Sequence, residues 1–284
     1  MKFPKHLRRD IPTGKVLKTD NILKDLNINT VCSQALCPNQ FECFSRKCAT
    51  FLACGNVCTR SCAFCNIKHS KSPPPLDESE IYNIALAAKK LDLKHIVITM
   101  VTRDDLEDKG AIHLSKIILE TKKQNPNSTI EVLTSDFSNS YDLIEIILDC
   151  KVDIFNYNIE TVKRLSTKIR SVATYENSLN LLKYVNNTKK VRFIKSGLMV
   201  GLGETKEEVF ETIKALKASG CDIITIGQYF APNKKKYPIK DFISPSTFKE
   251  YESFGKSLNV KYIYADSYVR SSYNSELIIN SINN

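Results

Sequence analysis

The sequence predicts an α/β fold in which parallel strands and helices form a partial (β/α)6 barrel with N- and C-terminal extensions. Apolar or β-branched runs recur about every 24 to 40 residues, and helical patterns separate them. One run and one helix make a βα unit, which places successive strands parallel in one sheet. The five clearest runs are 95–101, 129–135, 153–159, 192–200 and 222–230.

The run 50–57 supplies a sixth strand at the start of the barrel. Six units are too few for a closed eight-stranded barrel, and strand order alone leaves a doubly wound sheet as the alternative. Catalytic loops of βα barrels follow the carboxyl ends of the strands. We therefore expect the polar motifs that end each run to meet at one mouth.

The helices that flank the strands are recognisable by their spacing and their caps. Apolar residues recur at helical spacing in 77–91 and 205–219. Each segment begins with a capping-box pattern, Asp77 with Glu80 and Thr205 with Glu208, and Gly220 ends the second. A helix at 246–258 and a strand-like run at 261–269 follow.

The ends of the chain suggest a division into three parts. Residues 1–31 show weak periodicity and are interpreted as an extended lead-in. We expect an N-terminal extension over 1–45, the barrel over 46–245 and a C-terminal extension over 246–284.

Composition indicates an ordinary globular protein of 284 residues, 42% hydrophobic and 25% charged. No apolar stretch in the sequence suits a signal peptide or a membrane span, so a cytoplasmic location without membrane contact is expected. In that compartment dense cysteines indicate metal or redox chemistry instead of disulfides. The net charge of +10 leaves nucleic acid, an acidic partner protein or solubility as explanations.

Eight of the ten cysteines lie between residues 32 and 65. Cys58, Cys62 and Cys65 form a C-x3-C-x2-C triplet, which can hold three irons of a 4Fe-4S cluster and leave the fourth iron open. A zinc site or a merely buried set is the alternative, but zinc sites favour paired C-x2-C units. The triplet therefore predicts an iron-sulfur centre with an open iron for chemistry.

A second trio precedes the first. Cys32, Cys37 and Cys43 lie in the phrase CSQALCPNQFEC, and three thiolates again suggest a cluster. The two trios predict two 4Fe-4S clusters in one protein.

The motifs closely resemble those of the lipoyl synthases, a family of the radical S-adenosylmethionine (SAM) superfamily, from about residue 30 to residue 273. The motifs that carry the resemblance are CSQALCPNQFEC, FLACGNVCTRSCAFC, PPPLD, VTRDDL, EVLTSDF, FNYNIETV, KSGLMVGLGET, IGQYFAP and RSSY. The resemblance implies a TIM-like partial barrel of radical SAM type. It also implies a sulfurtransferase that inserts two sulfur atoms at C6 and C8 of a protein-bound octanoyl-lysine chain.

The same resemblance implies cofactors and partners. They are two 4Fe-4S clusters, SAM, an octanoylated lipoyl domain or glycine-cleavage H protein as substrate, and a low-potential electron donor of ferredoxin or flavodoxin type. Nucleic acid is not expected as a partner. Cys32, Cys37 and Cys43 would hold the auxiliary cluster, which is the sulfur source, with Ser271 in preference to Ser272 as fourth ligand.

The resemblance further suggests which residues bind SAM. They are Phe64 beside Cys65, Asn158 and Glu160 at a strand end, Arg170, and Gly201, Gly203 and Glu204 in the glycine stretch. Helix capping for Asn158 and Glu160, a solvated surface position for Arg170 and an ordinary turn for the glycines are the alternatives.

The sequence departs from the family pattern at two places. Tyr157 stands where relatives usually have histidine, and residues 45–48 include Cys48 in place of a glycine-rich stretch. Cysteines outside the trios are interpreted as structural, and the histidines receive no role because none has metal-site spacing. These are Cys48, Cys54, Cys150, Cys221, His6, His69, His95 and His113.

Two other functions compete with this interpretation. A tRNA methylthiotransferase would use the basic charge for RNA, but it needs two further domains for which the chain has no room. A non-catalytic iron-sulfur or zinc protein would normally saturate its metal with four protein ligands. The open-iron triplet argues against it.

Overall fold

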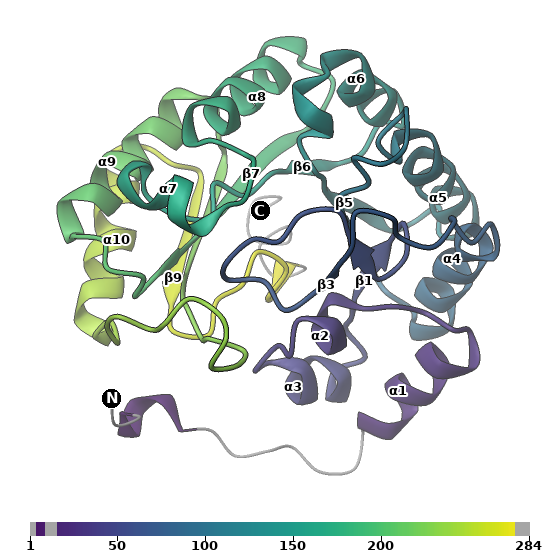
Figure 1. Ribbon diagram of the computed structural model, residues 1–284, viewed down its shortest axis with the longest axis horizontal. Coiled ribbons are helices and arrows are strands. Elements are labelled where there is room, and N and C mark those ends of the chain that lie inside the picture. Colours follow the sequence, from purple (N-terminus) through teal and green to yellow (C-terminus); the bar gives the residue numbers. More distant parts are fainter. Residues whose placement is uncertain (1–3, 9–15, 276–284) are drawn as a thin grey trace.

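The computed structural model describes residues 4–8 and 16–275 and shows a curved parallel sheet with helices outside it (Figure 1). The strands follow one another in chain order, and each pairs in parallel with the next. They are β1 (Thr50–Ala53), β4 (His95–Met100), β5 (Thr129–Leu133), β6 (Ile154–Asn156), β7 (Phe193–Val200), β8 (Ile223–Gln228) and β9 (Tyr262–Asp266). The predicted partial barrel is confirmed, and the predicted C-terminal strand adds a seventh strand beside β8.

Helices cover the outer face of the sheet, as βα units require. They are α4 (Ser79–Leu91), α5 (Ala111–Gln124), α6 (Tyr141–Asp149), α7 (Lys163–Ile169), α8 (Tyr175–Thr188), α9 (Lys206–Ala218) and α10 (Pro245–Ser257). All six residues of β4 and all six of β8 are buried, because parallel strands are covered on both faces. None of the helices in the described ranges combines the length and the apolar character that crossing a membrane demands.

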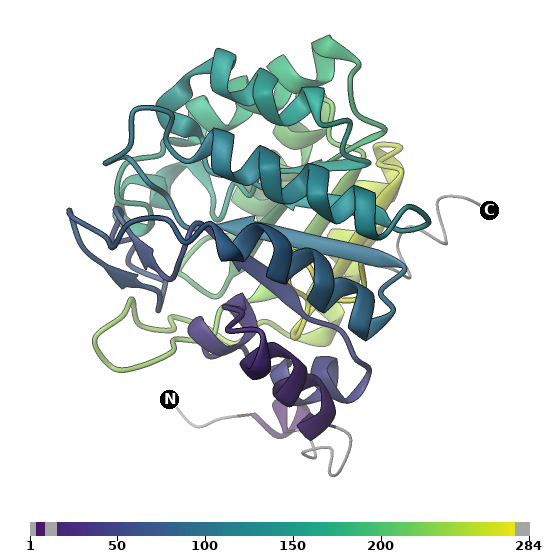
Figure 2. The ribbon, with the colours of Figure 1, turned by 90° about the vertical axis from the view of Figure 1, so that its right-hand side faces the viewer.

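The N-terminal segment bridges the two ends of the sheet. It contains α1 (Val16–Asp25), α2 (Val31–Gln34) and α3 (Gln40–Ser45). Thr30 forms a bridge with Phe51 of β1, and Asn39 Nδ2 donates a 2.7 Å hydrogen bond to the carbonyl of Tyr268, which follows β9. Figure 2 shows these helices packed against one side of the barrel.

Two sequence expectations are wrong. Residues 1–31 are not simply extended, because α1 buries Leu23 and its Thr19 Oγ1 donates a 2.7 Å hydrogen bond to the carbonyl of Phe44. Residues 1–3 and 9–15 lie outside the described residues. The expected capping box at Asp77 is also absent, because the Glu80 carboxylate instead accepts from the backbone N–H groups of Cys54 and Gly55.

Several strands are shorter than their sequence patterns. The run 50–57 divides into β1 and the separate two-residue strand β2 (Val57–Cys58), which pairs with β3 (Lys68–His69). By contrast, the capping box of α9 forms as predicted between Thr205 and Glu208. The chain after β1 thus leaves the main sheet early and forms the cysteine loop.

A buried charge network crosses the barrel interior. The carboxylate of Glu131 accepts hydrogen bonds from Lys195 Nζ at 2.8 Å and Asn156 Nδ2 at 2.7 Å, and His95 Nε2 lies 3.3 Å away. Glu131 and Lys195 are fully buried. Burial opposes ionisation of Glu131, but the attraction of Lys195 and the contact with His95 outweigh it and lower its pKa from 4.5 to about 2.

We expect Glu131→Gln to lower the free energy of unfolding at pH 7 by about 3–5 kcal/mol, because it leaves the Lys195 ammonium buried without a counter-ion. The folded pKa of Glu131 lies below its ordinary value, so its contribution is present above pH 4.5 and fades as the pH falls toward 2. Urea unfolding at several pH values measures both effects.

The control is Glu211→Gln, which removes the exposed pair with Lys214 and should cost less than about 1 kcal/mol. Equal losses in the two variants, or an unchanged acid dependence in Glu131→Gln, would contradict the account of the network.

Candidate functional site: a cavity shared by two cysteine trios

One cavity of about 610 Å³ runs through the barrel interior, from Thr50 and His95 at the amino ends of β1 and β4 to segments that follow the carboxyl ends of several strands. All six cysteines of the two trios line it: Cys32, Cys37, Cys43, Cys58, Cys62 and Cys65. Segments that follow β4, β5, β6, β8 and β9 complete its wall. The motifs after these five strands therefore meet at one cavity, as the sequence predicts, whereas the segment that follows β7 does not line it.

The first trio lies on the loop that follows β1. Cys58 ends β2, and the next residue, Thr59, is fixed to the end of β4 by a hydrogen bond from its N–H to the Thr102 carbonyl. Burial, together with the neighbouring thiols of Cys62 and Cys58, raises the pKa of Cys65 to about 11. Metal binding at this thiol must therefore release a proton.

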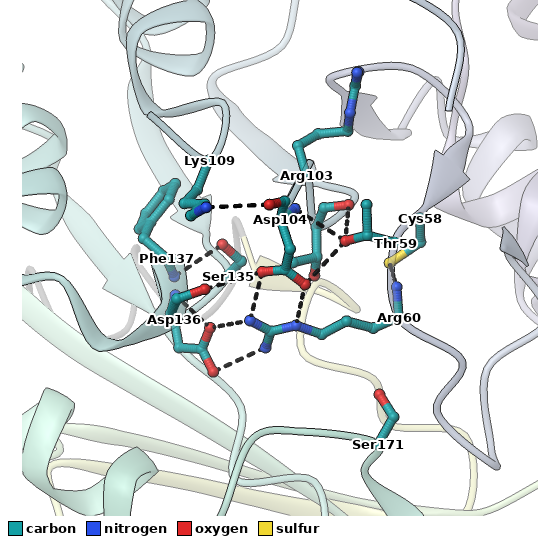
Figure 3. Close-up of polar contacts among 12 residues, drawn as sticks. Cys58, Thr59, Arg60, Arg103, Asp104, Lys109, Ser135, Asp136, Phe137 and Ser171 are labelled. Atoms are coloured by element: carbon teal, nitrogen blue, oxygen red, sulfur yellow. Dashed lines mark hydrogen bonds and ion pairs between the residues drawn. The ribbon is translucent and has the colours of Figure 1, made fainter. Parts of the chain in front are cut away.

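Arg60, inside the same loop, is held between two carboxylates (Figure 3). Its guanidinium donates two hydrogen bonds to Asp104 at 2.8 and 2.9 Å and two to Asp136 at 2.7 and 2.9 Å. The side chains of Arg60 and Asp136 are 7% and 3% exposed, so solvent weakens this contact little. The loop with Cys58 and Cys62 is thereby tied to the ends of β4 and β5.

Burial disfavours the charge on Arg60, yet the hydrogen bonds that it donates to Asp104 and Asp136 raise its pKa above its ordinary high value. For Asp104, burial is likewise outweighed by Arg60, and its pKa is lowered. Arg60 and Asp104 therefore stay charged at any physiological pH. We call Arg60, Asp104 and Asp136 the arginine clamp.

We expect Arg60→Lys to lower iron binding or SAM cleavage at the first trio about 10- to 100-fold, the usual effect of removing a group that orients metal ligands. A lysine keeps the positive charge but cannot form bidentate hydrogen bonds with two carboxylates at once. Iron content and 5′-deoxyadenosine formation measure the effect. The matched control is Arg164→Lys, which alters an exposed bidentate contact between Arg164 and Glu208. Normal iron loading and cleavage in Arg60→Lys would contradict the role of the clamp.

The second trio comes from α2, α3 and the turn between them. Burial raises the pKa of Cys32 to about 12, with a further contribution from Cys37. Burial raises the pKa of Cys43 to about 12 as well, and both Cys32 and Cys37 add to the shift. The three thiols therefore lie close enough to repel one another when ionised.

The C-terminal RSSY segment contacts α3, the helix that carries Cys43. Tyr273 donates its hydroxyl to Glu42 at 2.9 Å, and the guanidinium of Arg46 lies 5.6 Å from the centre of the Tyr273 ring. Ser271 and Ser272 both line the cavity. Ser271 Oγ accepts a 2.8 Å hydrogen bond from Asn158 Nδ2, which fixes the serine hydroxyl to the segment after β6 on the wall of the cavity.

Four of the expected SAM contacts line the cavity: Phe64, Asn158, Glu160 and Arg170. Glu160 has a left-handed backbone, with φ 68°, a strained conformation that is common at functional sites. Burial raises the pKa of its carboxyl, while Arg170 opposes the shift. Arg170 also donates a 2.6 Å hydrogen bond to the hydroxyl of Tyr157.

The remaining three expected contacts, Gly201, Gly203 and Glu204, are not among the residues that line the cavity. The Glu204 carboxylate accepts from the backbone N–H groups of Gly201 and Leu202 and so stabilises the turn after β7. A Cβ at Gly201, where φ is 91°, would lie 2.2 Å from Gln228 Nε2. Packing alone therefore requires this glycine.

The thiols of the two trios are suited to bind iron-sulfur clusters. Within residues 4–8 and 16–275, no three histidine, cysteine, aspartate or glutamate side chains converge as they would around a single metal ion. In a 4Fe-4S cluster each thiolate binds a different iron, so the ligands do not need to meet at one point. Both trios consist of free thiols that face one cavity, which fits two clusters.

The other cysteines and the histidines are placed differently. Cys54, Cys150 and Cys221 are buried, as expected of structural residues, whereas Cys48 lines the cavity beside the second trio. His95 and His113 form buried pairs with Glu131 and Glu80. His69 is exposed, and the side chain of His6 lies outside the described part of the structure.

Sequence reasoning missed the clamp. The sequence did contain a signal for it: Arg60 lies inside the cysteine triplet, and Asp104 and Asp136 each follow a strand. Sequence reasoning also did not predict the structural role of Gly197, which belongs to the KSGLMVGLGET motif. A Cβ there would lie 2.7 Å from Thr225 Oγ1 and 3.2 Å from Ser271 Oγ, so this glycine makes room for Ser271.

Solved structures with this architecture include methylornithine synthase (PylB), which is 13% identical to this chain. Its TM-score is 0.55, and the match covers 94% of this chain and 93% of that protein. SuiB of Streptococcus suis bound to S-adenosylmethionine matches with a TM-score of 0.60 and 12% identity, over 80% of this chain and 53% of that one. At such identities the likeness establishes the fold alone.

Sequence comparisons establish the family. Residues 52–216 match the model of the radical SAM superfamily. The chain is 47% identical to a lipoyl synthase of Protochlamydia amoebophila (strain UWE25), over 98% of this chain and 87% of that protein. It is 46% identical to a lipoyl synthase of Caldicellulosiruptor saccharolyticus (strain ATCC 43494 / DSM 8903 / Tp8T 6331), over 97% and 96%. The chain therefore belongs to the radical SAM superfamily and, within it, to the lipoyl synthase family.

Proposed function

We propose that this protein inserts two sulfur atoms, at C6 and C8, into an octanoyl chain carried on a lysine of another protein. The observation that carries the proposal is the placement of both cysteine trios around a single cavity. When bound, SAM at the first cluster supplies a 5′-deoxyadenosyl radical and the auxiliary cluster supplies sulfur. The fold contributes proximity, since it holds both sets of thiols within reach of one substrate chain.

The cavity wall also suits an alkyl chain and a radical. Apolar side chains of Leu36, Leu52, Phe64, Leu133 and Met199 line it between the polar groups. Such a wall binds the octanoyl methylenes and keeps water and other hydrogen donors away from them.

Charged and polar groups at the strand ends would orient SAM. We assign the Arg170 guanidinium to its carboxylate and Asn158 and Glu160 to its polar groups, with Phe64 packed beside the cluster. Gly201, Gly203 and Glu204 would act through the backbone of the turn after β7. Each assignment is tested by replacing one of these residues at a time. Calorimetry on the protein loaded with clusters then measures the affinity of each variant for SAM.

Ser271 is our candidate for the fourth ligand of the auxiliary cluster. Its support is the packing of the RSSY segment on α3 through Tyr273 and Glu42. Retained SAM cleavage with lost sulfur insertion in Ser271→Ala supports the assignment. Full lipoyl formation by that variant would move the role to Ser272 or remove it.

Octanoylated lipoyl domains or the glycine-cleavage H protein are the proposed substrates, and a ferredoxin or flavodoxin the proposed electron donor. All ten cysteines are free thiols, which suits the reducing conditions of a cytoplasm.

Mass spectrometry of an octanoylated H protein tests the function. We expect the anaerobically reconstituted protein, with SAM and a reductant, to convert octanoyl-lysine to lipoyl-lysine. SAM cleavage without sulfur in the carrier, or thiomethylation of tRNA in the same assay, would overturn the proposal.

A further inference from the structure

Two loops that carry no acidic residue border the mouth of the cavity. Residues 59–76 and 229–240 contain lysines but no aspartate or glutamate. Lys68, Lys71, Lys234 and Lys235 are exposed, and Lys236 is half-buried. We call these five lysines the basic rim. Both loops project from the same side of the barrel, the left side of Figure 2.

Hydrogen bonds hold the two loops together. The N–H of Tyr237 donates to the carbonyl of Ala63 at 2.9 Å, and Asn233 Nδ2 donates to Asn66 Oδ1 at 3.0 Å. The hydroxyl of Tyr229 donates to the Tyr237 carbonyl at 2.8 Å and fixes the second loop to the end of β8. The lysines therefore lie on two loops that brace each other, and the first of these loops also carries Cys62 and Cys65 of the first trio.

The rim lies directly at the cavity. Asn66, Ile67 and Pro232 line the cavity, and each lies within two residues of a rim lysine. A cavity of about 610 Å³ holds a chain or a cofactor but no folded domain. A carrier protein must therefore stay outside, and its surface must contact the rim while its modified lysine reaches in.

The charges of the rim are not neutralised within the protein. Across residues 4–8 and 16–275, no ion pair joins a rim lysine to a carboxylate. Elsewhere lysines do pair, as Lys190 with Glu145 at 2.6 Å and Lys206 with Glu250 at 2.7 Å. The neighbouring lysines of the rim repel one another. Binding of a negatively charged surface relieves this repulsion and is therefore favourable.

We propose that the basic rim docks an acidic face of the carrier domain, beside the octanoylated lysine. This inference rests on the proposed function and adds to it the surface and the charge that select the substrate. It accounts for part of the net charge of +10, which composition alone leaves unexplained. Attraction across the mouth raises the rate of encounter and orients the carrier lysine toward the cavity.

The test is a charge reversal at three exposed rim positions from both loops, Lys68→Glu, Lys234→Glu and Lys235→Glu in one variant. With octanoylated H protein as substrate, KM should rise about tenfold or more and lose its dependence on salt, while kcat stays near that of the unmodified protein. With a short uncharged peptide that carries octanoyl-lysine, both constants should stay unchanged.

The matched control reverses three exposed lysines on outer helices, Lys89→Glu, Lys90→Glu and Lys183→Glu, with the same change in net charge. The inference would be overturned by an unchanged KM in the rim variant or by an equal rise of KM in the control variant. It would also be overturned if the rim variant lost binding to tRNA but used octanoylated H protein normally. Absence of lipoyl product from either substrate with the unmodified protein would instead overturn the proposed function.

Discussion

Replacement of Cys58, Cys62 and Cys65 together by alanine will leave about four irons per chain and abolish reductive cleavage of SAM. The three thiols are the proposed ligands of the cluster with the open iron, and the second trio lies elsewhere, on α2, α3 and the turn between them. Iron and sulfide analysis after anaerobic reconstitution and chromatography of 5′-deoxyadenosine measure the two effects.

The matched control is a double alanine variant of Cys150 and Cys221, two buried thiols that are not among the residues that line the cavity. It should bind about eight irons and cleave SAM normally. Formation of 5′-deoxyadenosine by the triple variant would show that the open iron lies elsewhere.

Replacement of Cys32, Cys37 and Cys43 by alanine will separate SAM cleavage from sulfur insertion. The first trio and the arginine clamp are untouched, so cleavage continues, but the carrier receives no sulfur because its source is gone. Mass spectrometry of the octanoylated H protein gives the readout. A carrier that gains sulfur from this variant would contradict the role of the second trio.

The alternation of apolar runs and helical segments was enough to predict the sheet. Consecutive parallel strands in chain order follow directly from βα units, and β4, β5, β7 and β8 lie where their runs predict. The helix α1 was missed because its stability comes from contacts with α3, such as that of Thr19 with the Phe44 carbonyl, and its own periodicity is weak.

The cysteines of the site were predictable because their spacing in the sequence is itself the signal. The clamp was not, because Arg60, Asp104 and Asp136 come together only when the ends of β4 and β5 are adjacent. Glu80 shows the same limit. Its position suited a helix cap, but a buried contact with the backbone of Cys54 and with His113 competes for its carboxylate.

Isotopic labelling of the auxiliary cluster tests most directly the central claim that the two trios serve one cavity in different roles. The protein is reconstituted with isotopically heavy sulfide, freed of excess sulfide and allowed a single turnover on octanoylated H protein. We predict lipoyl-lysine in which both inserted sulfur atoms are heavy, and none in the variant that lacks Cys32, Cys37 and Cys43. Lipoyl-lysine with light sulfur, or heavy product from that variant, would contradict the account.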